Sequence, residues 1–595
     1  MVYSTKHILA SVLAVFCLSG AVAADKQTTP LQSTAIVMLD SGEFLFTNKG
    51  TKDIRKYSSD FSTVVKSWDF DQVPTGLAVT DTHYYVTTFS SNGELHKINA
   101  QSGEKEGSIK LESGSMYPLL TKDNKTLYVA NQFQNTISKV NLESFTSEGS
   151  APVSREPKGM VLSDDEKYMF VANFLPNQRS DIDTVCSTVT VLDLATFKPV
   201  KEIKLANGSN ALRGIALSPD KKFILVSHNL GRFQVPTNQL QQGWMNTSAV
   251  SIIDVEKQKF LGAVLLDEPE RGAAGIEKIA VSDTHLVVAH SGTHEVSIIE
   301  YQPFIDKFNA SPNQEALSYD LTFLFGLRQR VTVAGNGPRH LIVNDDKAYV
   351  PTYFADTLSV VDILTQEVVD VKAMQPNRVE SDIFKGEKYF NDAVFCFQSW
   401  QSCNGCHPGD ARQDGMNWDL MNDGVGNAKN CKSLLYSIQT PPSMISGIRA
   451  MAQIANRKGF THIQFSTIDE EKAVCVDKYS EALVHVPSPY LVNGELSELA
   501  KAGEKVFVKI GCADCHTPDT YYTDMQMHRI GDEKDFQQES GWDTPTLIET
   551  WRTAPYLFDG RAATMREVFE VYKHGINKKI STKDLDALVE FVNSL

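Results

Sequence analysis

The chain has 595 residues, which is beyond the size at which a single hydrophobic core stops growing, so at least two domains are expected. Its hydrophobic content of 42% and charged content of 22% are ordinary for a folded protein. The formal net charge of −16 argues against nucleic acid or an anionic membrane as the main partner.

Residues 1–23 have the pattern of a secretory signal peptide. Lys6 and His7 precede an apolar stretch from residue 8 to about residue 18, and Ala21-Val22-Ala23 forms a small-residue cleavage site. No later segment has the roughly 18 unbroken apolar residues of a membrane-spanning helix. We therefore expect an exported protein without a membrane span, located in a bacterial periplasm.

Residues 33–375 repeat one strand phrase seven times. Each unit contains an apolar strand with a polar last residue, such as Leu127-Tyr128-Val129-Ala130-Asn131, and these strands begin 40 to 62 residues apart. A period of this order is typical of β-propeller blades, because a single blade cannot bury both of its faces. The sequence predicts an all-β, seven-bladed propeller, and the phrase resembles that of the YVTN family of propellers. A Gln-, Gly- and Asn-rich insertion at 230–246 is expected to project from one face.

The last residue of each strand phrase is polar. Two of these residues, His228 and His290, could bind a metal. Two histidines without a third ligand make a poor metal site, however, and such side chains often satisfy turn backbone. We expect the second role.

From residue 380 to residue 595 the pattern changes to helical periodicity. The phrases that begin at Lys385-Gly386-Glu387 and Ala502-Gly503-Glu504 are similar, and each precedes a Cys-x-x-Cys-His motif. We predict a mainly α domain with two related lobes at about 380–486 and 490–595, separated by Pro487-Ser488-Pro489.

The two motifs are Cys403-Asn404-Gly405-Cys406-His407 and Cys512-Ala513-Asp514-Cys515-His516. In such a motif the two thiols attach a haem and the histidine binds its iron as the proximal ligand. Zinc sites also use Cys-x-x-Cys pairs, but these pairs lie 109 residues apart and a histidine follows each at once. We therefore predict two covalently bound haem c groups.

Four further cysteines follow the signal peptide: Cys186, Cys396, Cys431 and Cys475. An oxidising compartment permits disulfides among them. Cys396 and Cys431 flank the first motif and are the favoured pair. Free buried thiols are the alternative.

The segment from Thr553 to Met565 contains Ala554-Pro555-Tyr556 and Asp559-Gly560. It resembles the C-terminal haem lobe of bacterial dihaem cytochrome c peroxidases, and the resemblance covers about 380–595. It implies that the sixth ligand of the second haem lies eight residues after Thr564, at Tyr572, with His574 as a rival.

The chain departs from that family at two places. Asp423 stands where a histidine is usual, and Ser446-Gly447-Ile448-Arg449 stands where a Trp-Asp-Gly-Arg phrase is usual. Trp418 or Trp551 could replace the missing tryptophan between the haems. Met416 or Met421 could bind the first iron, but the missing histidine favours an open first haem.

The resemblance also implies a base for peroxide cleavage after the first motif. Glu470 lies in roughly the right place, with Glu471, Gln453 and His462 as alternatives, although acidic residues also suit an exposed first helical turn. A calcium ion between the lobes is a further implication, for which no acidic cluster marks a site.

Taken together, the resemblance implies a periplasmic dihaem oxidoreductase that uses hydrogen peroxide at an open first haem. The second haem would transfer electrons, and the propeller would dock an electron donor or a protein substrate. Two alternatives stay open: peroxide-dependent oxidation of a partner side chain, as in quinone-cofactor maturation, and a non-enzymatic electron-transfer cytochrome.

Overall fold

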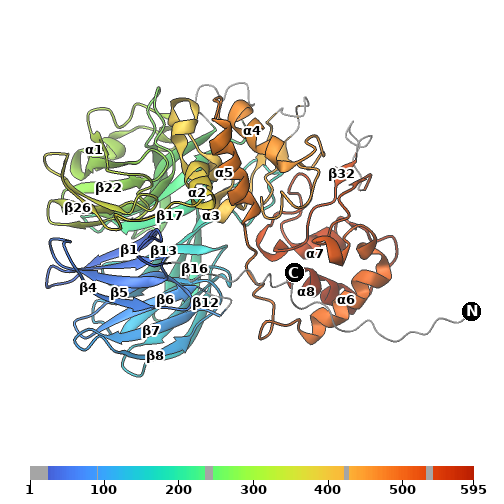
Figure 1. Ribbon diagram of the computed structural model, residues 1–595, viewed down its shortest axis with the longest axis horizontal. Helices are drawn as coiled ribbons and strands as arrows, with labels where there is room; N and C mark the ends of the chain where they lie inside the picture. Colours follow the sequence, from blue (N-terminus) through green and yellow to red (C-terminus); the bar gives the residue numbers. More distant parts are fainter. Residues whose placement is uncertain (1–24, 90–91, 235–244, 421–425, 427, 531–540) are drawn as a thin grey trace, which may run out of the picture.

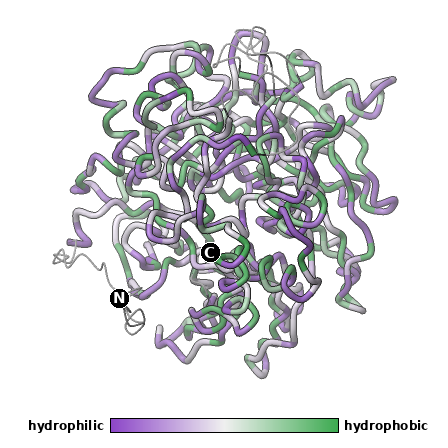
Figure 2. Tube along the Cα trace, turned by 90° about the vertical axis from the view of Figure 1, so that its right-hand side faces the viewer, coloured by the Kyte–Doolittle hydropathy of each residue, from purple (hydrophilic) through white to green (hydrophobic). Residues whose placement is uncertain are grey.

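A computed structural model describes residues 25–89, 92–234, 245–420, 426, 428–530 and 541–595. These residues form a β-propeller followed by a region of helices and irregular segments that lies against it (Figure 1). Hydrophobic and hydrophilic stretches alternate along the whole trace (Figure 2). None of the helices in the described part of the chain has the length and apolar character needed to cross a bilayer.

Seven antiparallel four-stranded sheets, consecutive along the chain, make up the propeller within the described residues, which confirms the predicted blade number. Their strands are β1 Ser33–Met38, β2 Phe44–Asn48, β3 Asp53–Tyr57 and β4 Val64–Asp69; β5 Val73–Val79, β6 His83–Phe89, β7 Glu94–Asn99 and β8 Lys105–Lys110; β9 Ser115–Leu120, β10 Thr126–Asn131, β11 Thr136–Asn141 and β12 Thr146–Pro152; β13 Pro157–Leu162, β14 Tyr168–Asn173, β15 Thr188–Asp193 and β16 Lys198–Lys204; β17 Ser209–Leu217, β18 Phe223–Gly231, β19 Asn246–Asp254 and β20 Lys259–Leu265; β21 Ile276–Val281, β22 His285–His290, β23 Glu295–Glu300 and β24 Arg328–Thr332; β25 Ile342–Asn344, β26 Lys347–Pro351, β27 Thr357–Asp362 and β28 Glu367–Ala373.

The repeated phrase is the second strand of every blade. These strands are buried along nearly their whole length, as in β10 and β14, because neighbouring blades cover both faces. Outer strands such as β8 and β16 are mostly exposed. The ring closes where Leu31 and Phe44 of the first blade pack with Leu358 of the last.

Two of the longer spacings between units are explained by insertions. Helix α1 (Tyr301–Ala310) lies between β23 and β24 and buries Phe304 and Phe308 against the propeller core. In the fifth blade, β18 and β19 extend as a pair as far as the register Gly231↔Asn246. Most of the predicted insertion, residues 235–244, lies outside the described residues.

His228 and His290 are structural, as expected. His228 contacts the backbone oxygen of Asn229 at 2.8 Å and the Ser251 hydroxyl at 2.7 Å. His290 makes the same two kinds of contact, with Ala273 and Ser297. Burial lowers the pKa of both histidines to about 4, so both are neutral near pH 7.

The region after the propeller is partly helical. Its helices are α2 Asp382–Asn391, α3 Pro408–Ala411, α4 Ala452–His462, α5 Glu470–Glu481, α6 Glu498–Ile510, α7 Met565–Glu570 and α8 Thr582–Asn593. Its short strands are β29 Asn417–Trp418, β30 Lys429–Asn430, β31 Met527–His528 and β32 Trp542–Asp543.

The repeated Gly-Glu-Lys phrase has a packing role. A Cβ atom added at Gly386 of α2 would lie 2.0 Å from the carbonyl oxygen of Cys475 in α5. A Cβ atom at Gly503 of α6 would lie 1.9 Å from the carbonyl oxygen of Ala587 in α8. Each lobe therefore needs glycine so that two helices can approach closely in front of its cysteine motif.

The propeller docks this second region directly. Arg552 forms a buried ion pair with Glu156 of the propeller, with Nε 3.2 Å from Oε1. His294 Nε2 lies 3.1 Å from a carboxylate oxygen of Asp392, and Ser180 donates a backbone hydrogen bond to the carbonyl of Gly560. The two regions thus share a polar, buried interface.

Candidate haem-attachment sites

The first motif forms a short 3₁₀ turn over Cys403–Gly405 after α2. Nδ1 of His407 lies 3.0 Å from the carbonyl oxygen of Arg412, to which it donates, so Nε2 is left free as a ligand atom. Burial lowers the pKa of His407, which keeps the ring in its neutral, metal-binding form.

The chain before Arg412 has an unusual backbone. Gly409 and Asp410 within α3 have positive φ values of 66° and 62°, so this element is a left-handed turn. The turn brings the Arg412 carbonyl back to His407, five residues behind it. Arg412 is held in turn by buried Glu549, with Nη2 3.0 Å from Oε1.

The second motif repeats this arrangement. Gly511, at φ 95°, ends α6, and Cys512–Asp514 forms the same kind of turn. Nδ1 of His516 lies 3.0 Å from the carbonyl oxygen of Tyr522. Two thiols and one oriented imidazole at each motif are the donor set that covalent haem attachment requires, so the residues fit the predicted cofactor.

His574 lies opposite His516 in the second lobe. The two imidazole centroids are 6.4 Å apart. Two metal–nitrogen bonds of about 2 Å, plus the distance from each nitrogen to its ring centre, add to roughly the same value. The hydroxyl of Tyr572 instead donates to the carbonyl of Arg561 at 2.9 Å. The geometry therefore favours His574 over Tyr572 as the second ligand.

An apolar cluster surrounds the first motif. It contains Val185, Phe233, Met245, Met416 and Trp418, which are buried and pack with Cys406 and Cys431. Three of its members come from the propeller. None of the three was predicted from the sequence, although Phe233 and Met245 lie within the insertion predicted at 230–246.

Two amide side chains, one from the propeller and one from the second region, reach the first motif. Asn246, the first residue of β19, has its amide nitrogen 3.3 Å from Sγ of Cys406. Gln464 approaches Sγ of Cys403 in the same way, at 3.2 Å. These amides contact the two sulfur atoms that the haem would use.

Asp414 is a buried carboxyl group beside this cluster. Nε1 of Trp418 donates to it at 2.7 Å, and the backbone N–H of Met416 donates at 2.9 Å. Burial raises the pKa of Asp414 to about 7. Asp414 thus holds the backbone of Met416 and the side chain of Trp418 in place. Met421 and Asp423 lie outside the described residues.

The predicted disulfide between Cys396 and Cys431 is wrong, since both residues are free thiols in the structure. Cys396 is buried at the end of a short turn, and burial raises its pKa to about 11. Sγ of Cys431 lies 3.1 Å from the carbonyl oxygen of Cys406 and 3.6 Å from Nδ1 of His407. Cys186 and Cys475 are free and buried as well.

Glu470 begins α5 on the surface and forms an ion pair with Arg457, with its two oxygens 3.1 and 2.9 Å from Nε. This is the exposed helix start that the sequence analysis offered as the simpler explanation. Its partner is not a residue of either motif, so the geometry gives no support for a base at Glu470.

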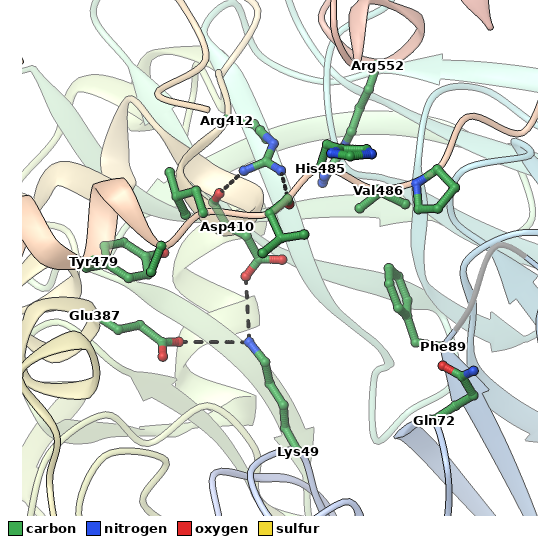
Figure 3. Close-up of a pocket in the computed structure, with 14 residues that line it drawn as sticks. Lys49, Gln72, Phe89, Glu387, Asp410, Arg412, Tyr479, His485, Val486 and Arg552 are labelled. Atoms are coloured by element: carbon green, nitrogen blue, oxygen red, sulfur yellow. Dashed lines mark hydrogen bonds and ion pairs between the residues drawn. The ribbon is translucent and has the colours of Figure 1, made fainter. Parts of the chain in front are cut away.

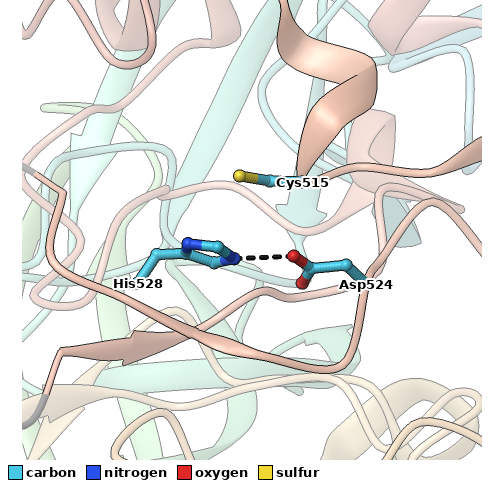
Figure 4. Close-up of side chains that lie close together, drawn as sticks. All are labelled: Cys515, Asp524 and His528. Atoms are coloured by element: carbon cyan, nitrogen blue, oxygen red, sulfur yellow. Dashed lines mark hydrogen bonds and ion pairs between the residues drawn. The ribbon is translucent and has the colours of Figure 1, made fainter.

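Within the described residues, the group of side chains able to share a metal ion is Cys515, Asp524 and His528 (Figure 4). Nε2 of His528 lies 2.6 Å from Asp524. With one carboxylate and a thiol, the group does not offer the oxygen ligands that calcium prefers. Because Cys515 belongs to the second motif, this group is part of the haem-attachment site.

A cavity of about 540 Å³ lies between the propeller and the second region and is lined by residues of both (Figure 3). Lys49 enters it from the first blade, with Nζ 4.0 Å from both Glu387 and Asp410. Lys49 is the largest influence that lowers the pKa of Asp410. Arg412 and His485 line the same cavity, which therefore reaches the residue that orients His407.

No family model matches the chain. Two subunits of hydrazine synthase from Kuenenia stuttgartiensis are similar to parts of it. The gamma subunit is 26% identical over 272 residues, covering 35% of this chain and 76% of that subunit. The beta subunit is 26% identical over 191 residues, covering 30% of this chain and 49% of that subunit, so about half of its length is matched.

A solved structure of Kuenenia stuttgartiensis hydrazine synthase aligns with 56% of this chain and 96% of its own chain, at a TM-score of 0.51 and 21% identity. This likeness concerns the fold, and it supports the β-propeller.

These similarities correct the sequence interpretation. They point to hydrazine synthase subunits and not to the dihaem cytochrome c peroxidase family, so the peroxide-dependent function and its two alternatives are replaced. The error has a physical cause. The residues behind the resemblance form a haem-attachment pattern, and such a pattern indicates a cofactor without specifying the substrate.

Proposed function

We propose that this chain is a dihaem c-type cytochrome that serves as a redox subunit of an enzyme of the hydrazine synthase type. The observation that carries the proposal is the similarity of one chain to two different subunits of that enzyme, gamma and beta. Haem c at each motif supplies one-electron oxidation and reduction of iron.

The residues around the motifs support different roles for the two lobes. His516 and His574 face each other at a spacing that suits one iron between them, which favours electron transfer in the second lobe. In the first lobe, Arg412 orients His407, and the apolar cluster with Met416 and Trp418 limits the access of water. We assign the formation of hydrazine to the first lobe.

Partner subunits and export belong to the same proposal. The relatives are named as subunits, which supports assembly of this chain with other proteins. The signal-peptide pattern of residues 1–23 and the extracytoplasmic attachment of haem to such motifs support a periplasmic location. The propeller's buried contacts with the second region support a role in building the site, since Asn246 contacts Cys406.

The test is hydrazine formation by the haem-loaded chain in its native assembly, with the product trapped by an aldehyde. We expect hydrazine from the unaltered protein and at least a tenfold loss in His407→Ala, with the absorption bands of the second haem retained. His83→Ala changes a half-buried histidine of β6 in the propeller and serves as the matched control. An assembly that carries both haems and forms no hydrazine would contradict the proposed reaction.

A further inference from the structure

The rings of two tyrosines from different lobes pack against each other in a tilted arrangement. The ring centroids of Tyr436 and Tyr521 are 4.8 Å apart, with an interplanar angle of 41°. Tyr436 packs with the cluster that contains Cys403 of the first motif. Tyr521 directly precedes Tyr522 in the chain, and the carbonyl oxygen of Tyr522 accepts the Nδ1 hydrogen of His516. The tilted pair therefore joins the surroundings of both motifs.

Tyr436 also has a built-in proton acceptor. Its hydroxyl lies 2.6 Å from Nδ1 of His485. His485 lines the 540 Å³ cavity beside Arg412 and Val486 (Figure 3), so a proton received by this ring has a polar space next to it. Burial is the largest cause that raises the pKa of Tyr436, which keeps the phenol protonated near pH 7.

The backbone at these residues is strained. Tyr436, Tyr521 and Tyr522 have φ values of 59°, 59° and 56°. The left-handed region is unfavourable for bulky residues, and each such residue costs on the order of 1–3 kcal/mol. Strain of this kind persists only where surrounding contacts enforce it.

The tryptophans offered by the sequence lie elsewhere. Nε1 of Trp418 donates to Asp414 within the first lobe. Trp551 packs edge-on against Phe133 of the propeller, with centroids 5.3 Å apart. Neither of these two contacts joins the two lobes, whereas the contact between Tyr436 and Tyr521 does.

We propose that Tyr436 and Tyr521 form the electron path between the lobes and that Tyr436 is oxidised reversibly, with His485 as its proton acceptor. This inference rests on the proposed two haems. The one-electron oxidant would be a haem iron oxidised beyond the ferric state, because the potential of a ferric haem c lies far below that of a tyrosine phenol. Tyr436 loses one electron, its O–H bond breaks, and the proton binds Nδ1 of His485, which leaves a neutral tyrosyl radical beside an imidazolium. An electron that arrives through Tyr521, together with the returning proton, restores the phenol.

The first measurement generates a radical with ruthenium(III), formed when an electron-accepting quencher oxidises a photoexcited ruthenium(II) complex, and it works whether or not haem is bound. We expect a tyrosyl signal by electron paramagnetic resonance, narrowed by ring-deuterated tyrosine and reduced at least tenfold in Tyr436→Phe. His485→Gln should shorten the lifetime of the radical at least tenfold, because the amide is a weaker base. Tyr319→Phe, on the exposed surface of the propeller, is the matched control.

The second measurement follows electron equilibration between the haems after partial reduction in a stopped-flow instrument. Tyr436→Phe and Tyr521→Phe should each slow it at least tenfold, and Tyr319→Phe should leave it unchanged. A protein with both haems in which Tyr436→Phe alters neither the radical nor the rate overturns the relay. A chain that acquires no haem when it matures contradicts the proposed function, and if that chain still forms the radical at Tyr436 under the ruthenium oxidant, this tyrosine is kept as a redox site.

Discussion

His574 and Tyr572 lie two positions apart, yet the structure directs them to different neighbours. Helix α7 ends at Glu570, and Lys573 has a positive φ of 52°, which reverses the chain. The reversal turns the His574 ring toward His516 and leaves the Tyr572 hydroxyl on the carbonyl of Arg561. An assignment by counting eight residues from Thr564 assumes that the helix continues.

The spectra of two variants distinguish the two residues as candidate ligands of the second haem. His574→Ala should remove the sixth ligand of the second haem and convert its oxidised iron from low spin to high spin. Tyr572→Phe should leave the spin state unchanged, because it removes only a hydrogen bond to a carbonyl. Absorption and electron paramagnetic resonance spectra of the two variants check this, and a high-spin second haem in Tyr572→Phe alone would contradict the assignment.

The second lobe contains two helices in close contact, α6 and α8, and Gly503 makes this contact possible. At Gly503 an added methyl group would overlap backbone of α8, so the helices would have to separate. Gly459 of α4 has open space instead, with no atom within 4 Å of an added Cβ. The two positions therefore form a matched pair for the same substitution.

Gly503→Ala should lower the melting temperature of the second lobe and reduce its haem content, because α6 leads directly into Cys512. Gly459→Ala should be neutral or stabilising by up to about 1 kcal/mol, the difference in helix propensity. Thermal unfolding followed by circular dichroism and by haem absorption measures both. Equal stability of the two variants would show that the helices can move apart without cost.

At the scale of the whole molecule, three buried histidines make stability depend on pH. Burial lowers the pKa of His228 and His290 to about 4 and that of His340 to about 3. Unfolded histidine titrates near 6.5, so between these values the unfolded chain binds more protons. Stability is therefore full above about pH 6.5, falls as the pH drops toward 4, and its loss is complete below the folded pKa values.

Melting temperatures between pH 7.5 and pH 4 test this expectation. His290→Gln removes one of the titrating groups and should reduce the loss of stability in acid. His462→Gln, on the surface of α4, should leave it unchanged. An acid dependence in His290→Gln equal to that of the unaltered protein would mean that other groups cause it.

The propeller could be predicted from the sequence because each blade repeats a local pattern. A strand such as β10 is covered on both faces, so its residues must be apolar wherever the unit recurs. The two motifs could also be predicted, since their chemistry depends on adjacent residues. Both predictions use information contained within a few tens of residues.

The docking of the propeller could not be predicted, because its contacts join residues far apart in the chain. Asn246 contacts Cys406, and Glu156 pairs with Arg552, across 160 and 396 positions. Neither asparagine nor glutamate carries a local signal for such a role. The contact between the rings of Tyr436 and Tyr521 depends likewise on how the two lobes pack against each other.

The central claim is that both cysteine motifs carry covalently attached haem. Intact-mass spectrometry of the denatured protein tests it most directly, after maturation in cells that attach haem c. The account predicts a mass that corresponds to two haems, one haem after serine replaces Cys403 and Cys406, and one after serine replaces Cys512 and Cys515. A mature chain with one haem or none, or a mass unaffected by either pair of substitutions, would contradict it.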